Sequence, residues 1–286
     1  MILSSGITKA LAGIALVLVL PLLAQAVEMK ARERWHSQDM DVVESDIVAE
    51  VKFGREVAAR IVGRYGLYDD DQVNRYVNLV GSSVAVSANR PELIFRFAVL
   101  DTQEINAYAA PGGYIFVTKG ALAQMQDEAE LATVLAHEVA HVAGRHVVKE
   151  LNIKGAEGGA AGGMARLAGG ATEAARATMG QIVDKAVDIL FKDGYKREDE
   201  IQADRDSILY STVANYDASA LIRYFERLNA VKGKSTEVLD KTHPTYDARI
   251  SWLKDTINGE GIDPYKMKSN KDRFQESVKT AELIKK

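Results

Sequence analysis

The sequence contains no cysteine, and this absence excludes several kinds of site at once. Disulfide bonds, thiolate metal sites, cysteine nucleophiles and an acylated lipoprotein cysteine all require that residue. A basic excess is also missing, because 36 lysines and arginines face 40 aspartates and glutamates, for a formal net charge of −4. Nucleic-acid-binding proteins normally carry a basic face, so no nucleic-acid partner is expected. Histidine occurs only 5 times, so any cluster of histidines is informative.

The first 26 residues differ from the rest of the chain. Lys9 is their only charged residue, an apolar run occupies 10–24, and Ala24-Gln25-Ala26 has the small residues of a cleavage site. This pattern predicts a secretory signal peptide over 1–26. An uncleaved membrane anchor is the alternative, although the run is short and Pro21 interrupts it. An exported chain without cysteine fits a bacterial periplasm, with membrane association if the segment is retained.

The remaining chain has the composition of a globular protein, with 47% hydrophobic and 27% charged residues overall. Apolar residues at helical spacing predict helices over 45–65, 71–87, 126–150, 195–211, 217–228 and 248–257. Apolar, β-rich segments predict strands over 93–100, 107–109 and 114–118. Asp127 is expected to cap the helix over 126–150, and the tail over 258–286 is polar without a chemical signal. The chain is therefore expected to be α+β, mostly helical, with a small sheet.

Residues 155–180 are dominated by glycine and alanine and form the one biased stretch of the chain. Glycine lowers the cost of changing backbone angles, so a mobile cover over a cleft is one hypothesis. A pair of closely packed small-residue helices, or a disordered loop, is the alternative.

The chemical signal lies in His137-Glu138-Val139-Ala140-His141. Two histidines four residues apart on a helix share one face, so both imidazoles can reach one metal ion. Glu138 can then lean over the open coordination position as a general base. Two surface histidines on an ordinary helix are the alternative, but the apolar flanks predict a buried helix. His146 lies about half a turn round from His137 on a continuous helix, so it is expected to face elsewhere as a structural or surface residue.

A catalytic zinc site needs a third protein ligand and an open fourth position. The segment over 197–204 is rich in carboxylates, and Glu200 and Asp204 are again four residues apart. Glu200 is a candidate ligand, and Asp204 a candidate acceptor for the other ring N–H of a metal-bound histidine. The alternative is a solvated acidic face, and this is our interpretation of Glu198 and Asp199.

These motifs, taken in order, resemble the HtpX-type zinc metallopeptidases. HEVAH at 137–141, EIQAD at 200–204 and HPTYDARI at 243–250 carry the resemblance, together with NAYAAPGGYIFV at 106–117. The family belongs to the gluzincins and includes the CAAX prenyl-protein endopeptidases. The chain is most similar to its soluble bacterial envelope members, of the BepA and LoiP type. The resemblance implies a zincin-type metallopeptidase domain over 27–257, with the small sheet beside the active-site helix.

The resemblance also implies roles for individual residues. One Zn²⁺ would be bound by His137, His141 and Glu200, with Glu138 as the general base. His243 would either stabilise the oxyanion, with Tyr246 as a further donor, or close the site by occupying the zinc. Arg249 would orient the cleft or form a structural salt bridge. An extended substrate is expected to pair with the strand that contains Tyr114, Ile115, Phe116 and Val117.

The function expected from this reading is a zinc endopeptidase of the bacterial envelope, which cuts unfolded or misassembled proteins as quality control. Three alternatives stay open. A self-inhibited zinc protein could act mainly as a chaperone or assembly factor for envelope proteins, with His243 in the open position. The metal site could be purely structural. A membrane-anchored protease would result if residues 1–26 are not cleaved.

Overall fold

The computed structural model describes residues 43–155, 173–230 and 237–278. Residues 1–26, for which a signal peptide is predicted, lie outside the described residues. So do residues 156–172, which make up most of the stretch rich in glycine and alanine. The end of that stretch belongs to helix α8, Glu173–Asp188. Among the described residues, no helix combines the length and apolar character needed to cross a membrane.

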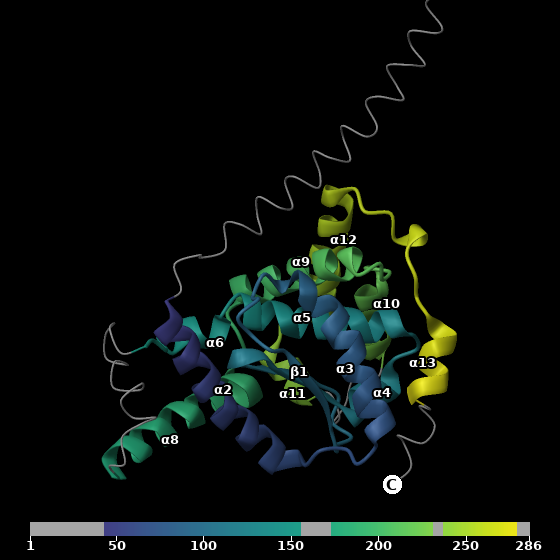
Figure 1. Ribbon diagram of the computed structural model, residues 1–286. Coiled ribbons are helices and arrows are strands. Elements are labelled where there is room, and N and C mark those ends of the chain that lie inside the picture. The colour runs from purple at the N-terminus through teal and green to yellow at the C-terminus, as the bar shows by residue number, and fades with distance from the viewer. Residues whose placement is uncertain (1–42, 156–172, 231–236, 279–286) are drawn as a thin grey trace, which may run out of the picture. The chain divides into compact units, whose positions relative to one another are not determined.

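The chain begins with two helices and a short sheet (Figure 1). Helix α2 spans Glu44–Tyr65, and α3 spans Asp71–Ala85 with the Asp70 side chain as its N-cap. A short 3₁₀ helix, η1, covers Val86–Ala88. The three strands are β1 (Arg96–Leu100), β2 (Ala107–Ala110) and β3 (Tyr114–Thr118), with the turn η2 (Pro111–Gly113) between β2 and β3. The mostly helical α+β class predicted from the sequence is confirmed.

The order of the strands is β1-β3-β2, with β3 parallel to β1 and antiparallel to β2. Phe97 is opposite Ile115 on one side of β3, and Tyr108 is opposite Phe116 on the other. The expectation that a substrate strand pairs with Tyr114–Val117 is therefore wrong. Both hydrogen-bonding edges of β3 are already occupied, and a central strand has no free edge to offer.

The outer edge of β1 is covered by side chains of α3. The Phe97 N–H donates to Asn78 Oδ1 at 3.1 Å, and the Val99 N–H donates to Asn74 Oδ1 at 2.9 Å. The Val99 carbonyl accepts from the Tyr68 N–H at 2.8 Å. These contacts satisfy backbone groups that would otherwise be available to another strand. Strand β2 is left as the edge that faces the central helix.

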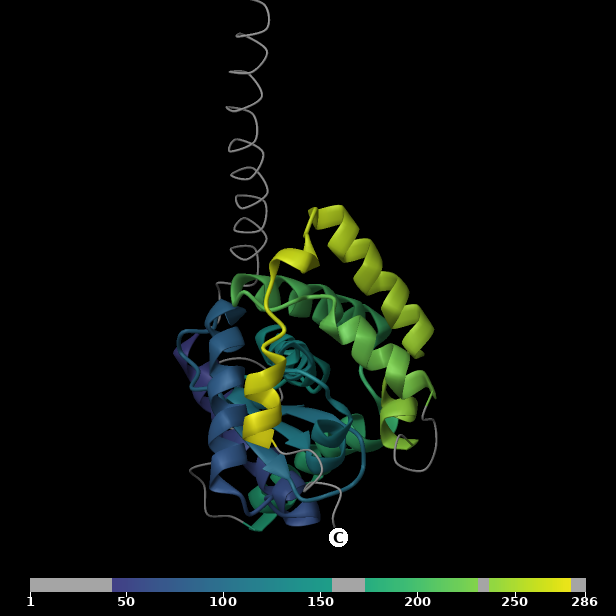
Figure 2. The ribbon, with the colours of Figure 1, turned by 90° about the vertical axis from the view of Figure 1, so that its right-hand side faces the viewer.

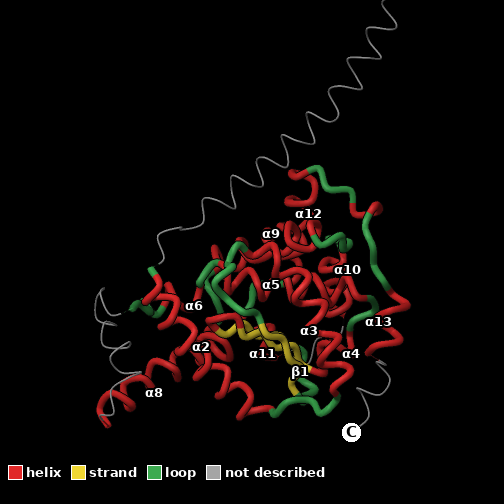
Figure 3. Tube along the Cα trace, viewed as in Figure 1, coloured by secondary structure: helices red, strands yellow, loops and turns green. Residues whose placement is uncertain are grey.

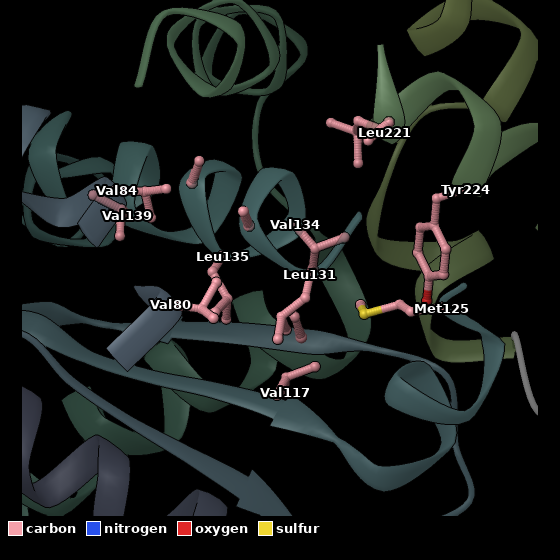
Figure 4. Close-up of a cluster of buried hydrophobic side chains, with 14 of the residues drawn as sticks. Val80, Val84, Val117, Met125, Leu131, Val134, Leu135, Val139, Leu221 and Tyr224 are labelled. Atoms are coloured by element: carbon pink, nitrogen blue, oxygen red, sulfur yellow. The ribbon is translucent and has the colours of Figure 1, made fainter. Parts of the chain in front are cut away.

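That central helix is α5, Glu128–Ala143, and every one of its residues is buried. Asp127 caps it as predicted, because its side chain accepts from the Glu130 N–H at 3.0 Å. Figures 2 and 3 show α5 between the sheet and helix α9, Arg197–Val213. Its apolar side chains pack onto the sheet and α3 on one side and onto α10 on the other (Figure 4). The packed residues include Val80, Val84, Val117, Met125, Leu131, Val134, Leu135, Val139, Leu221 and Tyr224.

The predicted continuous helix over 126–150 is wrong at its C-terminal part. Helix α5 is capped at Gly144, and Arg145 adopts a left-handed conformation with φ 57° before the short helix α6, His146–Glu150. The Arg145 Nε donates to Glu50 Oε2 of α2 at 3.1 Å. This contact holds an otherwise uncommon backbone conformation for arginine. The chain therefore turns back beside the helix that carries the histidines.

The C-terminal part of the fold is helical. It contains a π-helical turn η3 (Ile189–Asp193) after α8, α10 (Ala220–Ala230), α11 (Glu237–Thr242), α12 (Tyr246–Glu260), η5 (Pro264–Lys266) and α13 (Lys271–Val278). The short helix α4 (Lys119–Gln124) lies earlier, between β3 and α5. The polar tail contributes to the core, because Phe274 and Val278 of α13 are buried. Arg273 pairs with Glu128, whose carboxylate also accepts from Tyr76 and Tyr216. Helix α13 thus ties the end of the described chain to the start of α5.

Candidate metal centre

Four side chains from separate parts of the chain meet at one point. His137 and His141 project from α5, Glu200 from the first turn of α9, and His243 from the segment after α11. One potential ligand atom of each lies within 4.8 Å of the others. The Nε2 atoms of the two α5 histidines are 3.0 Å apart, and Glu200 Oε1 lies 3.5 Å from His141 Nε2. His243 Nε2 lies 3.6 Å from the same Glu200 oxygen.

The cluster has the chemistry of a cation site. Both carboxylate oxygens of Glu200 are buried without a hydrogen-bond partner, which is costly for a group that can ionise. Burial raises the pKa of Glu200 well above its ordinary value. Burial also lowers the pKa of His137 to about 4 and that of His141 well below its ordinary value, which favours neutral imidazoles. Neutral imidazoles and a carboxylate are ligands of divalent transition metals, so these residues fit a metal ion.

The other side of His137 is held by a buried ion pair. His137 Nδ1 lies 3.0 Å from Asp204 Oδ1, one turn beyond Glu200 on α9. Arg249 of α12 binds both oxygens of Asp204, through Nη2 at 2.6 Å and Nε at 3.0 Å. Burial opposes ionisation of Asp204, but Arg249 and the hydrogen bonds outweigh it and lower the Asp204 pKa to about 2. The predicted second-sphere carboxylate thus lies beside a histidine of the cluster, and Arg249 faces that carboxylate.

Glu138 and His243 line a common cavity beside the cluster. Burial raises the pKa of Glu138 to about 8, partly opposed by the Arg249 charge. Apart from those polar groups, Asn106, His137 and Arg249, the cavity lining is apolar or aromatic. It comprises Ala107, Ala121, Val134, Leu221, Tyr224, Phe225 and Leu239. Tyr246, expected as a further donor, is buried with its ring packed 5.7 Å from the ring of Phe225.

The chain matches a known family of peptidases. The model of the Peptidase family M48 matches residues 71–257, which include all four residues of the cluster. The chain belongs to peptidase family M48. By family it is a metallopeptidase, and the resemblance drawn from its motifs is confirmed.

Individual relatives agree with this assignment. The beta-barrel assembly-enhancing protease of Escherichia coli K12 is 23% identical over 239 residues, covering 81% of this chain and 48% of that protein. A Vibrio cholerae protein, given the same name provisionally, is 31% identical over 209 residues, covering 71% and 43%. Metalloprotease YcaL of E. coli is 25% identical over 219 residues, covering 77% and 80%. The chain thus spans about half the length of the first two relatives.

Two aromatic residues of this M48 domain, which the motifs do not identify, contact His141. His146 Nδ1 lies 2.8 Å from His141 Nδ1, so the expectation that His146 faces elsewhere is wrong. It follows the break at Gly144 and Arg145, and burial lowers its pKa. Tyr195, just before α9, stacks on His141 with ring centroids 3.8 Å apart, and its hydroxyl donates to the Ala109 carbonyl at 3.4 Å. The preceding residue, Gly194, has a φ of 76°, a backbone conformation that favours glycine. This glycine is the local feature of the sequence that indicates a turn just before Tyr195.

Proposed function

We propose that the protein is a zinc-dependent endopeptidase that hydrolyses peptide bonds of unfolded or misassembled proteins in the bacterial cell envelope. The observation that carries this proposal is the buried Glu200 carboxylate, without a hydrogen-bond partner, between two neutral histidines. Beside it, Glu138 shares an apolar cavity with His243. The M48 match and the names of the relatives support peptide hydrolysis, and the relatives named for β-barrel assembly support envelope proteins as substrates.

The proposed mechanism assigns a separate task to each residue. Zinc, when bound by His137, His141 and Glu200, would supply a Lewis acid that polarises the substrate carbonyl and favours deprotonation of water. The Glu138 carboxylate accepts a proton from the attacking water and returns it to the leaving nitrogen. His243 donates through Nε2 to the carbonyl oxygen as negative charge develops there.

Removal of one proposed ligand tests the metal site directly. Glu200→Gln is expected to lower zinc content from about one ion per chain to well under half, because an amide is a much weaker zinc ligand than a carboxylate. The measurement is elemental analysis after dialysis against micromolar zinc. Glu198→Gln is the matched control, since Glu198 is exposed on the same turn of α9 and should leave the zinc content unchanged. Full zinc content in Glu200→Gln, or a wild type without zinc, would count against the proposal.

The substrate is proposed to add a strand to β2 rather than to β3. The Thr118 N–H donates to the Asn106 carbonyl at 3.0 Å, so by alternation Tyr108 and Ala110 also face β3. Ala107 and Ala109 therefore direct their backbone groups away from β3, toward the side on which the cavity and His141 lie. On that side the Ala107 N–H donates to Asn106 Oδ1 at 2.9 Å and the Ala109 carbonyl accepts from Tyr195, so the Ala109 N–H is the group proposed to pair with the substrate. An extended peptide on this edge would pass the cluster while contacting mostly main-chain atoms, which suits unfolded substrates of varied sequence.

Ala109→Pro tests this edge, because proline removes the outward N–H while the bonds to β3 remain. Loss of one backbone hydrogen bond of about 0.5–1.5 kcal/mol predicts a fall in kcat/KM of roughly 2- to 13-fold, mainly through KM. Ala109→Ser keeps the N–H and is the control. Steady-state kinetics on an unfolded protein substrate, with circular dichroism to check folding, measure the effect. A folded Ala109→Pro variant with wild-type kcat/KM would rule out pairing at Ala109.

A second candidate function follows from the position of His243. Because a ring nitrogen of His243 is one of the four ligand atoms within 4.8 Å, and its Nε2 lies 3.6 Å from Glu200 Oε1, His243 could occupy the open coordination position and leave the protein self-inhibited, acting as a chaperone or assembly factor. Hydrolysis that appears only after His243→Ala would favour this alternative. Wild-type hydrolysis that is lost in His243→Ala would favour the role in stabilising the oxyanion.

The periplasm is the proposed location, supported by the signal-peptide pattern over 1–26. If that segment is cleaved, N-terminal sequencing of the protein from a periplasmic fraction should begin near Val27. Recovery of the protein from the cytoplasm with an intact N-terminus would contradict this location.

A further inference from the structure

The two histidines of α5 are each contacted on the ring nitrogen that faces away from the cluster. His137 Nδ1 lies 3.0 Å from Asp204 Oδ1, and His141 Nδ1 lies 2.8 Å from His146 Nδ1. The first contact is the usual arrangement, in which a carboxylate accepts the ring N–H of a metal-bound histidine. The second places another imidazole at the equivalent position, and the mechanism proposed above does not use it.

A single arrangement of protons satisfies this second contact when a metal is bound. An imidazole that coordinates through Nε2 keeps its proton on Nδ1 and can only donate from there. His146 Nδ1 must then accept, so His146 is the tautomer with its proton on Nε2. That Nε2 faces Asp199 Oδ1 at 3.7 Å, and Asp199 is partly exposed at the start of α9. The gap is longer than a direct hydrogen bond, and within the described residues this buried Nε2 has no hydrogen-bond partner.

The chain around His146 is built to hold it at this distance. Helix α5 ends three residues before it, at Ala143, and Arg145 is held in the left-handed region by the buried Glu50. A Cβ added to Gly144 would lie 2.3 Å from His146 Nε2, so only glycine leaves room for the ring. The side chain is 3% exposed and packs edge-on against His141, with ring centroids 4.9 Å apart. An ordinary continuation of α5 would have carried His146 away from this position.

We propose that His146 is a positioning residue that accepts the Nδ1–H of His141, fixes that ligand's tautomer and ring orientation, and thereby raises the affinity of the centre for zinc. The inference rests on the proposed function, because it requires His141 to be a zinc ligand. It gives the two α5 histidines different partners, a carboxylate for His137 and a neutral imidazole for His141. The anionic partner is the stronger acceptor, so removal of His146 should weaken the site rather than abolish it.

Two variants separate the hydrogen bond from packing. His146→Asn keeps an acceptor close to the position of Nδ1, whereas His146→Leu fills a similar volume without one. The zinc dissociation constant is measured for wild type and both variants by competition with a chromophoric chelator. His146→Leu is expected to bind zinc about 10- to 100-fold more weakly, and His146→Asn within about 3-fold of wild type. Equal affinity in His146→Leu and wild type would overturn the inference.

A spectroscopic measurement on the wild type does not depend on how the variants fold. Long-range ¹H–¹⁵N spectra of the zinc-loaded protein should show His146 with its proton on Nε2 and an unprotonated Nδ1. A His146 protonated on Nδ1 would overturn the inference even if the variants lose affinity. A wild type that takes up no zinc contradicts the proposed function and the inference together. A wild type that binds zinc, with a Leu variant of equal affinity, contradicts the inference alone.

Discussion

Glu138→Gln is expected to lower the rate of hydrolysis of an unfolded protein substrate by about 10²–10⁴-fold while zinc content stays at the wild-type level. The amide has nearly the same shape as the carboxylate but cannot accept the proton of water. Glu138 lies outside the set of proposed ligands, so its replacement should leave the metal in place. The measurement pairs release of fluorescent peptides from labelled casein with elemental analysis of the same sample.

Glu198→Gln controls for the substitution itself, because this exposed glutamate should leave hydrolysis unchanged. If the wild type is inactive through occupation of the open position by His243, the comparison is repeated in the His243→Ala background. A Glu138→Gln variant that retains more than a tenth of the rate, with zinc bound, would remove Glu138 from the mechanism. Such a result would instead favour a structural metal site.

Arg249→Met is expected to lower the free energy of unfolding by about 3–5 kcal/mol, because it leaves a buried carboxylate without its cation. Arg249 is only 2% exposed, and it makes two hydrogen bonds to Asp204. Its guanidinium also lies over the ring of Phe225, 4.3 Å from the ring centroid. The measurement is urea denaturation of the metal-free protein at pH 7, so that zinc binding does not enter the comparison.

The difference in the free energy of unfolding between wild type and Arg249→Met should depend on pH, because the pKa of Asp204 is lowered in the folded protein. A carboxylate whose pKa falls from 3.8 to about 2 on folding stabilises the folded state fully above pH 3.8. That contribution is lost as the pH falls towards 2, so wild type and Arg249→Met should converge in acid. Lys254→Met breaks an exposed pair with Glu226, at 3.6 Å, and should cost under about 0.5 kcal/mol. A loss for Arg249→Met no larger than this control would show that the buried pair is not stabilising.

A double variant sharpens this test. In Arg249→Met with Asp204→Asn, no uncompensated charge is buried at this position, and the amide oxygen can still accept from His137. Recovery of part of the lost stability is therefore expected. If the double variant is less stable than Arg249→Met alone, the loss arises from packing on Phe225 rather than from the ion pair.

Local sequence patterns pointed to three residues of the cluster, whereas His243 followed only from the family resemblance. His137, Glu138 and His141 share a helix, and their spacing alone places the two imidazoles on one face. Glu200 and Asp204 follow from the same rule on α9, once a third ligand is sought. Each of these five positions depends on helical periodicity, which a single sequence displays directly.

The features missed by the sequence depend on contacts between distant segments. The break after α5 requires Arg145 to adopt positive φ, and the residue that holds it, Glu50, is 95 positions away. No local pattern predicts that conformation for an arginine, and His146 was misplaced as a result. The predicted pairing of a substrate with Tyr114–Val117 failed for a related reason. That β3 lies between β1 and β2 is decided by which segments pair in space, and no local pattern shows it.

The contact between helix α13 and Glu128 affects how the catalytic unit should be delimited. The family match ends at residue 257, yet Arg273 and Asn270 reach back to a carboxylate at the first turn of the histidine helix. A chain trimmed at that boundary would keep every proposed ligand. It would leave the buried Glu128 carboxylate with the hydroxyls of Tyr76 and Tyr216 but without Arg273 and Asn270. Recombinant versions of this enzyme should therefore extend through Val278 if the helix bearing the metal ligands is to keep its N-terminal anchor.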